Sequence, residues 1–214
     1  DKIEGRTVPV PSGHTVIIRR EPYGVVLAVT PWNAPLFTAG WNVFPALAAG
    51  NAVVLKPSEF TPLTSLVLGK LCIEAGLPRG LVQVVCGPGQ GTGAALLAAP
   101  EVARVTFVGG PPAGAAVAAA CAARTIPCVL ELGGKSANIV FDDANFAAAV
   151  QGAQQAIFAG AGQSCVAGSR LLVQRSVHDR FVAAMTEAAA RIRMGDPLDA
   201  ATEIGPVANA RAIS

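Results

Sequence analysis

The chain has 214 residues, of which 52% are hydrophobic and 14% are charged, and its formal net charge is +2. This length and composition allow a buried core in one large or two modest domains and exclude a disordered chain. Because the sequence has no basic stripe and no apolar run long enough to span a bilayer, we expect neither a nucleic-acid partner nor a membrane.

The opening residues, 1–22, predict an antiparallel β-hairpin. They alternate between apolar and polar side chains and contain a Ser12–Gly13 turn. The segment Ile3–Arg6 reads IEGR, which also matches a protease-cleavage linker, but the residues after it continue directly into strand-like sequence.

Near-continuous apolar runs follow, each typical of a strand buried on both faces of a parallel sheet. They are Gly24–Thr30, Asn51–Pro57, Leu81–Gly87, Arg104–Gly110, Val129–Gly134 and Ala137–Asp143. Helical patterns alternate with them at Phe37–Ala49, Pro62–Ala75, Thr92–Ala99, Pro112–Arg124, Asn145–Ala159 and His178–Met194. This alternation predicts an α/β fold with a doubly wound parallel sheet.

Two glycine-rich segments each follow a strand and precede a helix. They read GPGQGTG at Gly87–Gly93 and GGPPAG at Gly109–Gly114. Free backbone N–H groups at such points favour a phosphate, although neither segment is a GxGxxG motif and both also fit simple tight turns. Lys56 and Glu59 end another buried strand, where they could hold ribose hydroxyls or form a solvated turn.

The five cysteines include no CxxC pair and there are only two histidines, so we expect no metal site and reduced thiols, as in a cytoplasmic protein. Four cysteines lie in apolar sequence and predict small core residues: Cys72, Cys86, Cys121 and Cys128. Cys165 differs, because its neighbours are glycine, glutamine and serine. It could fill a packed turn or be a nucleophile held open to a substrate, and spacing alone does not decide.

Taken together, these motifs resemble the aldehyde dehydrogenase superfamily, in the family's order and spacing. The segments that carry the resemblance are PWNAP (Pro31–Pro35), LKPSEFTPLT (Leu55–Thr64), FVGGPPAG (Phe107–Gly114), LELGGKSANIVFDD (Leu130–Asp143), GQSCVAGSR (Gly162–Arg170) and EIGPVAN (Glu203–Asn209). The chain is less than half as long as a usual member and looks like the middle of one. The resemblance implies an oligomerisation hairpin at 1–22, part of a Rossmann-like dinucleotide-binding domain at 23–133 and the N-terminal part of a catalytic domain at 134–214.

The resemblance implies an NAD-dependent oxidation of an aldehyde to a carboxylic acid. Cys165 would be the nucleophile that forms a thiohemiacetal and then a thioester. Asn33 would donate a hydrogen bond to the developing oxyanion. Glu131, at the end of an apolar strand, would activate the hydrolytic water, and we expect burial to raise its pKa.

The resemblance also implies the cofactor site. Lys56 and Glu59 would bind the adenosine ribose, and a carboxylate there favours NAD over NADP because it repels a 2′-phosphate. The other expected cofactor residues are Thr30, Pro31, Trp32, Gly89, Gly93, Phe107, Gly109, Gly110, Gly114, Leu132 and Gly133.

Ala34, Thr38 and Trp41 recur at helical spacing, and in the family this face borders the substrate tunnel. They could equally form a core-facing stripe. With Ser164 they are the expected substrate-lining residues, and they would suit a medium-sized apolar or aromatic aldehyde.

Two positions depart from the family pattern. Gly110 stands where most members have a serine that contacts the pyrophosphate, and Asn42 stands where many have a lysine. The family's downstream glutamate and phenylalanine have no counterpart before Ser214.

Two alternatives remain. One is a truncated, non-catalytic nucleotide-binding or assembly module, and the other is a cysteine hydrolase that uses Cys165 and His178. For the longer enzyme we expect a homodimer or homotetramer that acts on a small-molecule aldehyde in the cytoplasm.

Overall fold

The computed structural model describes residues 3–210, and the chain divides into two compact units, Asp1–Glu131 and Leu132–Ser214. Residues 1–2 of the expected hairpin region and residues 211–214 of the expected catalytic region lie outside the described part.

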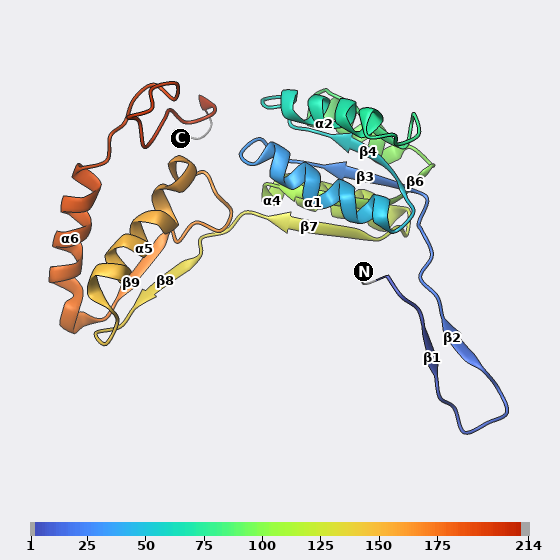
Figure 1. Ribbon diagram of the computed structural model, residues 1–214, viewed down its shortest axis with the longest axis horizontal. Helices are drawn as coiled ribbons and strands as arrows, with labels where there is room; N and C mark the ends of the chain where they lie inside the picture. Colours follow the sequence, from blue (N-terminus) through green and yellow to red (C-terminus); the bar gives the residue numbers. More distant parts are fainter. Residues whose placement is uncertain (1–2, 211–214) are drawn as a thin grey trace. The chain divides into compact units, whose positions relative to one another are not determined.

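A five-stranded parallel sheet forms the centre of the first unit (Figure 1). Its strands are β3 (Val25–Val29), β4 (Ala52–Lys56), β5 (Val82–Val84), β6 (Val102–Gly109) and β7 (Cys128–Leu132). They lie in the order β5-β4-β3-β6-β7, and β3 pairs in parallel with both β4 and β6. The chain therefore starts its sheet in the middle, builds one side and then the other, as doubly wound folds do. The predicted fold class is confirmed.

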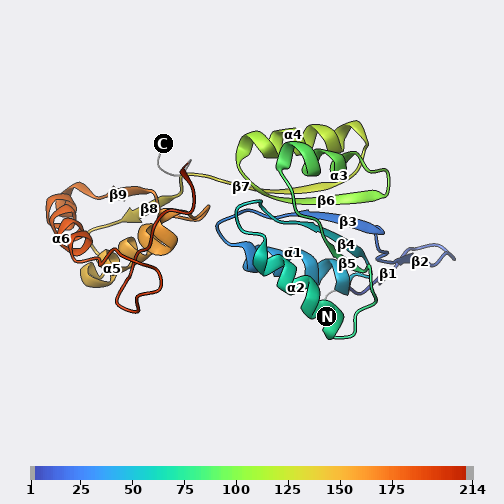
Figure 2. The same cartoon turned by 90° about the horizontal axis from the view of Figure 1, so that it is seen from above.

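Helices cover both faces of this sheet (Figure 2). On one face lie α1 (Pro35–Ala48) and α2 (Leu63–Glu74), and on the other lie α3 (Ala94–Ala98) and α4 (Pro111–Ala123). Neighbouring residues of β3 pack on opposite faces of the sheet. Ala28 belongs to the hydrophobic cluster with α1 and α2, and Leu27 belongs to the hydrophobic cluster with α4. Because these strands are buried on both faces, the apolar runs of the sequence are nearly continuous.

The predicted N-terminal hairpin is a separate two-stranded antiparallel sheet. It consists of β1 (Arg6–Val8) and β2 (Val16–Ile18), with Arg6 opposite Ile18. All three residues of β2 are exposed, so the hairpin presents apolar side chains that the described residues do not cover.

The second unit is a smaller α/β layer. Strands β8 (Ala137–Val140) and β9 (Arg170–Val173) pair in parallel, and α5 (Phe146–Phe158) and α6 (His178–Ala190) pack together. The centre of the unit is Phe181, which is fully buried and meets Phe146 edge-on at a centroid distance of 5.7 Å. The Asn145 side chain caps α5 by accepting from Ala148 N at 3.1 Å.

Two helical predictions need correction. The helix expected at Thr92–Ala99 is preceded by a π-helical turn at Gly89–Gly93, and only Ala94–Ala98 is α-helical. Glycine-rich backbone is poorly suited to a regular α-helix, which accounts for the change. The last helix ends at Ala190 rather than Met194. Among residues 3–210, no helix combines the length and apolar character needed to cross a bilayer.

Candidate active site

The topological switch point of the doubly wound sheet lies between β3 and β6. These strands are adjacent, but the helices that follow them, α1 and α4, cover opposite faces, so the loops at their carboxyl ends diverge. In open α/β sheets, ligands bind at this switch point. Thr30, Pro31 and Trp32 leave β3 here, and Phe107 and Gly109 belong to the end of β6.

A buried polar atom without a partner among the described residues lies beside this switch point. Thr30 is buried and its backbone N–H donates to Lys56 O at 3.1 Å, but its Oγ1 has no partner among the described residues. Buried hydroxyls are nearly always hydrogen-bonded, so an unpaired one beside the switch point fits a site completed by a polar ligand.

Lys56 is held at the end of β4 with only 2% of its surface exposed. Its Nζ donates to Pro57 O at 2.7 Å and to Gly87 O at 2.8 Å. Burial lowers the pKa of the Lys56 ammonium, and nearby Glu59 and Cys86 oppose that shift. Because an ammonium has three N–H donors, one remains for a hydroxyl such as that of a ribose. Glu59 is exposed and can act as an acceptor beside it.

The first glycine-rich segment folds tightly over Lys56. Gly87 has φ +150°, and a Cβ there would fall on Thr92 Oγ1. A Cβ at Gly93 would lie 3.5 Å from Lys56 Cε. Gly89 is different, since a Cβ on it would meet nothing within 4 Å. Close packing therefore requires a glycine at position 87, whereas the space beside Gly89 is open to a ligand.

The second glycine-rich segment offers fewer phosphate donors than expected. Gly110 is the N-cap of α4, and prolines occupy the first two helical positions, so neither provides an N–H. Gly114 N donates to Gly110 O at 3.0 Å, which leaves the amide of Ala113 as the donor of this first turn. Gly109 is required by packing, because a Cβ there would lie 2.6 Å from the Phe107 ring. The residues around Lys56 therefore offer the donor and acceptor that a ribose needs, whereas the start of α4 offers few amides to a diphosphate.

The expected substrate-lining residues at the start of α1 differ in their exposure. Thr38 is only 5% exposed and its hydroxyl donates to Ala34 O at 2.7 Å, so it belongs to the core side. Trp41 is 58% exposed and packs with tilted rings against Phe37, which is 69% exposed, at a centroid distance of 5.6 Å. Phe37 is not among the residues expected to line the substrate site, although its i,i+4 spacing from Trp41 places the two rings side by side. Asn42 Nδ2 donates to Thr38 O at 2.7 Å within the same helix.

The two candidate polar residues of the first unit are both exposed. Asn33 lies in the turn between β3 and α1. Glu131 lies near the end of β7, followed by the exposed Leu132 and Gly133. The expected burial of Glu131 is therefore not found, because β7 is an edge strand of its sheet.

Cys165 lies on an exposed loop of the second unit between α5 and β9. The loop is pinned after the cysteine, where Gly168 N donates to Ala156 O at 2.9 Å and Ala167 is buried. Half-buried Ser164 precedes the cysteine, and its carbonyl accepts from Ala167 N at 3.3 Å. The sulfur is thus not filler in a packed turn.

The other cysteines divide differently from the prediction. Cys72 and Cys121 are buried and Cys128 is partly buried, but Cys86 is exposed, because β5 ends at Val84 and the chain then leaves the sheet. Burial, with Cys128 alongside, raises the pKa of the Cys121 thiol to about 11.

Residues 3–210 contain no group of His, Cys, Asp and Glu side chains that could hold a metal ion. His178, the partner required by the hydrolase alternative, is hydrogen-bonded to Asp179 at 2.8 Å.

Both units therefore define a class of protein. A doubly wound sheet with a polar switch-point crevice is typical of dinucleotide-binding proteins, and an exposed loop cysteine is typical of enzymes that form a covalent intermediate. The chain belongs to the aldehyde dehydrogenase family, whose model matches residues 1–214.

Relatives with known names or structures agree with this assignment. The chain is 46% identical over 212 residues to betaine aldehyde dehydrogenase of Bacillus subtilis, covering 98% of this chain and 43% of the relative. It is 40% identical to cytosolic 10-formyltetrahydrofolate dehydrogenase of Xenopus laevis, covering 96% of this chain and 23% of that protein. It also resembles the crystal structure of PnpE from Pseudomonas sp. WBC-3 in complex with nicotinamide adenine dinucleotide, with 46% identity, a TM-score of 0.94, and coverage of 98% and 43% of the two chains. The chain thus spans less than half the length of these relatives.

Proposed function

We propose that this chain carries the nucleotide-binding and nucleophile-bearing parts of an enzyme that oxidises an aldehyde to a carboxylic acid, with NAD as the hydride acceptor. The observation that carries the proposal is the exposed Cys165, presented on a pinned loop in a chain whose whole length matches the family.

Cys165 would act first. An aldehyde carbon cannot release hydride while it is a planar carbonyl, so the Cys165 thiolate adds to it and makes a tetrahedral thiohemiacetal. The Asn33 side-chain amide and the Cys165 backbone N–H would donate to the oxyanion. One such donor contributes on the order of 3 kcal/mol to the transition state. Loss of hydride then leaves a thioester on Cys165.

Glu131 would complete the reaction. Its carboxylate would take a proton from a water molecule that attacks the thioester, which releases the acid and frees the thiol. Glu131 is exposed, so its carboxylate is accessible to such a water molecule.

The cofactor would lie along the crevice of the first unit. NAD, when bound, supplies the acceptor for the hydride. The remaining Lys56 N–H and the Glu59 carboxylate would bind its adenosine ribose, and Glu59 would disfavour NADP through repulsion of a 2′-phosphate. Gly89, Gly93, Gly109 and the start of α4 up to Gly114 would border the adenine and diphosphate.

For the substrate, the exposed pair Phe37 and Trp41 favours an aldehyde with an apolar or aromatic body. The same rings would also suit a quaternary ammonium group, and two relatives are named betaine aldehyde dehydrogenases. Comparing kcat/KM for benzaldehyde and betaine aldehyde decides between these two classes.

We also propose that the enzyme is a cytoplasmic homo-oligomer. The five cysteines are free thiols, which suits a reducing compartment. The exposed apolar residues of β2, Val16, Ile17 and Ile18, would be covered by another subunit in a dimer or tetramer.

The test of the nucleophile is Cys165→Ala in the intact protein, with Cys86→Ala as the matched control because both thiols are exposed. We expect Cys165→Ala to abolish NADH formation and leave NAD binding intact, and Cys86→Ala to retain activity. Oxidation that persists in Cys165→Ala would refute the role of the thiol. NAD binding without aldehyde oxidation by the parent would favour the non-catalytic module.

A further inference from the structure

The backbone that leads to Cys165 has an unusual conformation. Gly160, Ala161 and Gly162 all have positive φ, at 61°, 56° and 75°. This region is disfavoured for an L side chain such as that of Ala161, so the turn needs contacts from elsewhere to hold it.

The Gln163 side chain provides two such contacts. Its Nε2 donates to Gly160 O at 3.0 Å, and its Oε1 accepts from Ala208 N at 2.9 Å. The Gln163 backbone N–H also donates to Gly160 O, at 3.2 Å. One half-buried amide therefore joins the loop of Cys165 to a segment that lies 45 residues further along the chain.

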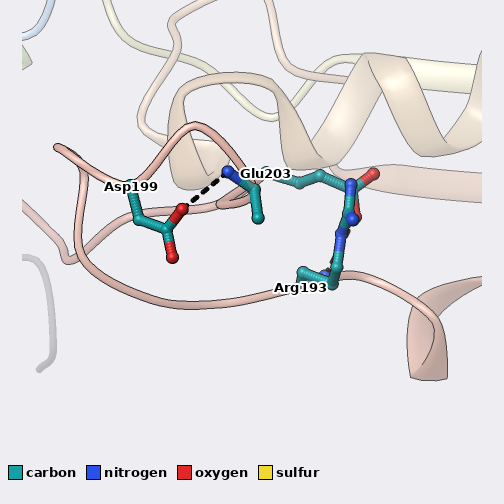
Figure 3. Close-up of polar contacts among 4 residues, drawn as sticks. Arg193, Asp199 and Glu203 are labelled. Atoms are coloured by element: carbon teal, nitrogen blue, oxygen red, sulfur yellow. Dashed lines mark hydrogen bonds and ion pairs between the residues drawn. The ribbon is translucent and has the colours of Figure 1, made fainter.

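That segment, Glu203–Ala208, which we call the return segment, is itself anchored (Figure 3). Arg193 N and Nε both donate to Glu203 Oε2 at 3.1 Å, and Glu203 N donates to Arg193 O at 2.9 Å. Within the intervening loop, Ala201 N donates to Asp199 Oδ1 at 2.8 Å. The return segment thus starts from a fixed point after α6 and ends on Gln163.

We propose that Gln163, held by the return segment, is a positioning residue for Cys165, an inference that rests on the proposed role of Cys165 as the nucleophile. Gln163 acts by orienting the Gly160 carbonyl and so the left-handed turn that delivers the cysteine. A methionine at this position keeps the length of the side chain but loses both hydrogen bonds. A glutamate keeps an oxygen for Ala208 N and loses the donor to Gly160 O.

The first test is the rate at which iodoacetamide alkylates Cys165 in the native chain, with the adduct located by peptide mass. A synthetic peptide of residues 160–168 gives the alkylation rate of Cys165 when the rest of the fold does not hold its loop. We expect the alkylation rate of Cys165 in the parent to differ from that in the peptide. In Gln163→Met the rate should shift by at least about threefold toward the peptide rate. In Gln163→Glu it should lie between the rates of the parent and of Gln163→Met. Gln155→Met, at an exposed glutamine of α5, is the matched control, and the exposed Cys86 is the internal standard.

The second test is amide hydrogen exchange of Ala208 and of residues 160–168. Loss of one hydrogen bond should speed exchange at Ala208 about fivefold in Gln163→Met, and Glu203→Gln should speed it less, because it loosens only the anchor. A parent alkylation rate equal to that of the peptide, or rates and exchange that Gln163→Met does not change, overturns the proposal.

These outcomes separate this inference from the proposed function. Full aldehyde oxidation by Cys165→Ala would remove the nucleophile and with it any positioning role, even if exchange still links Gln163 to Ala208. Unmoved rates together with an inactive Cys165→Ala would refute the positioning role alone.

Discussion

The double proline at the start of α4 should weaken binding of the diphosphate of NAD, and Pro112→Ala should restore part of that binding. Pro111 and Pro112 remove two of the amides that a helix N-terminus normally offers to phosphate. Ala113 provides the remaining N–H of the turn, because Gly114 N is already used by Gly110 O at 3.0 Å. Alanine at position 112 would return one N–H at the place where the diphosphate is expected.

The size of this effect follows from the exposure of the turn. A hydrogen bond to a charged group contributes about 1.5–3 kcal/mol, and one at an exposed turn such as this belongs below that range. We expect about 1 kcal/mol, which corresponds to a Kd for NAD that is about fivefold lower. Gly110→Ser tests the same deficit by a second route, since a Cβ at Gly110 would meet only Pro112 Cδ, at 3.9 Å.

Isothermal titration calorimetry of NAD and of adenosine separates the phosphate contribution from the rest. Pro112→Ala should tighten NAD and leave adenosine unchanged, and Pro100→Ala, at an exposed proline before β6, should change neither. Equal NAD affinities of parent and Pro112→Ala, or an equal gain for adenosine, would show that the missing amide of Pro112 does not limit diphosphate binding.

Three further outcomes follow from single side chains. Glu59→Gln should raise the NADP-to-NAD ratio of kcat/KM, and an unchanged ratio would remove the argument for NAD. The pKa of the Glu203 carboxyl is lowered chiefly by the hydrogen bond from Arg193 N. The Glu203 carboxylate therefore contributes fully to the free energy of unfolding above its unfolded pKa, about 4.3. This contribution is lost as the pH falls through the lower folded pKa. Urea unfolding from pH 3 to 7 should therefore show a weaker pH dependence in Glu203→Gln, and parallel curves would contradict this. The pKa of the Cys121 thiol is raised to about 11. The free energy of unfolding should therefore fall as the pH rises above about 8.5, where the thiol of the unfolded chain ionises. Urea unfolding of Cys121→Ala should show a smaller fall over the same pH range.

Much of the first unit could be predicted from the sequence because its strands are buried on both faces. Continuous apolar runs such as those at β3, β4 and β6 are typical of strands in the interior of a parallel sheet, and the helices between them require parallel pairing. The π-helical turn at Gly89–Gly93 could not be predicted, because glycine-rich sequence fits several backbone paths.

The exposure of the candidate site residues depends on neighbours that lie far away in sequence. Helical periodicity groups Thr38 with Trp41 but does not say which face of α1 meets the sheet, so the burial of Thr38 and the exposure of Phe37 could not be predicted from it. Likewise, the exposure of Glu131 follows from the edge position of β7, and strand order is a property of the whole sheet. The link from Gln163 to Ala208 joins residues too distant for any local pattern.

We propose above that Cys165 is the nucleophile of an NAD-dependent aldehyde dehydrogenase. The most direct measurement is iodoacetamide labelling of the native protein, with and without NAD, followed by peptide mapping of all five cysteines. We expect Cys165 to be labelled fastest and NAD to change its rate, while exposed Cys86 is labelled more slowly. Labelling of Cys165 no faster than that of Cys86, and insensitive to NAD, would contradict it.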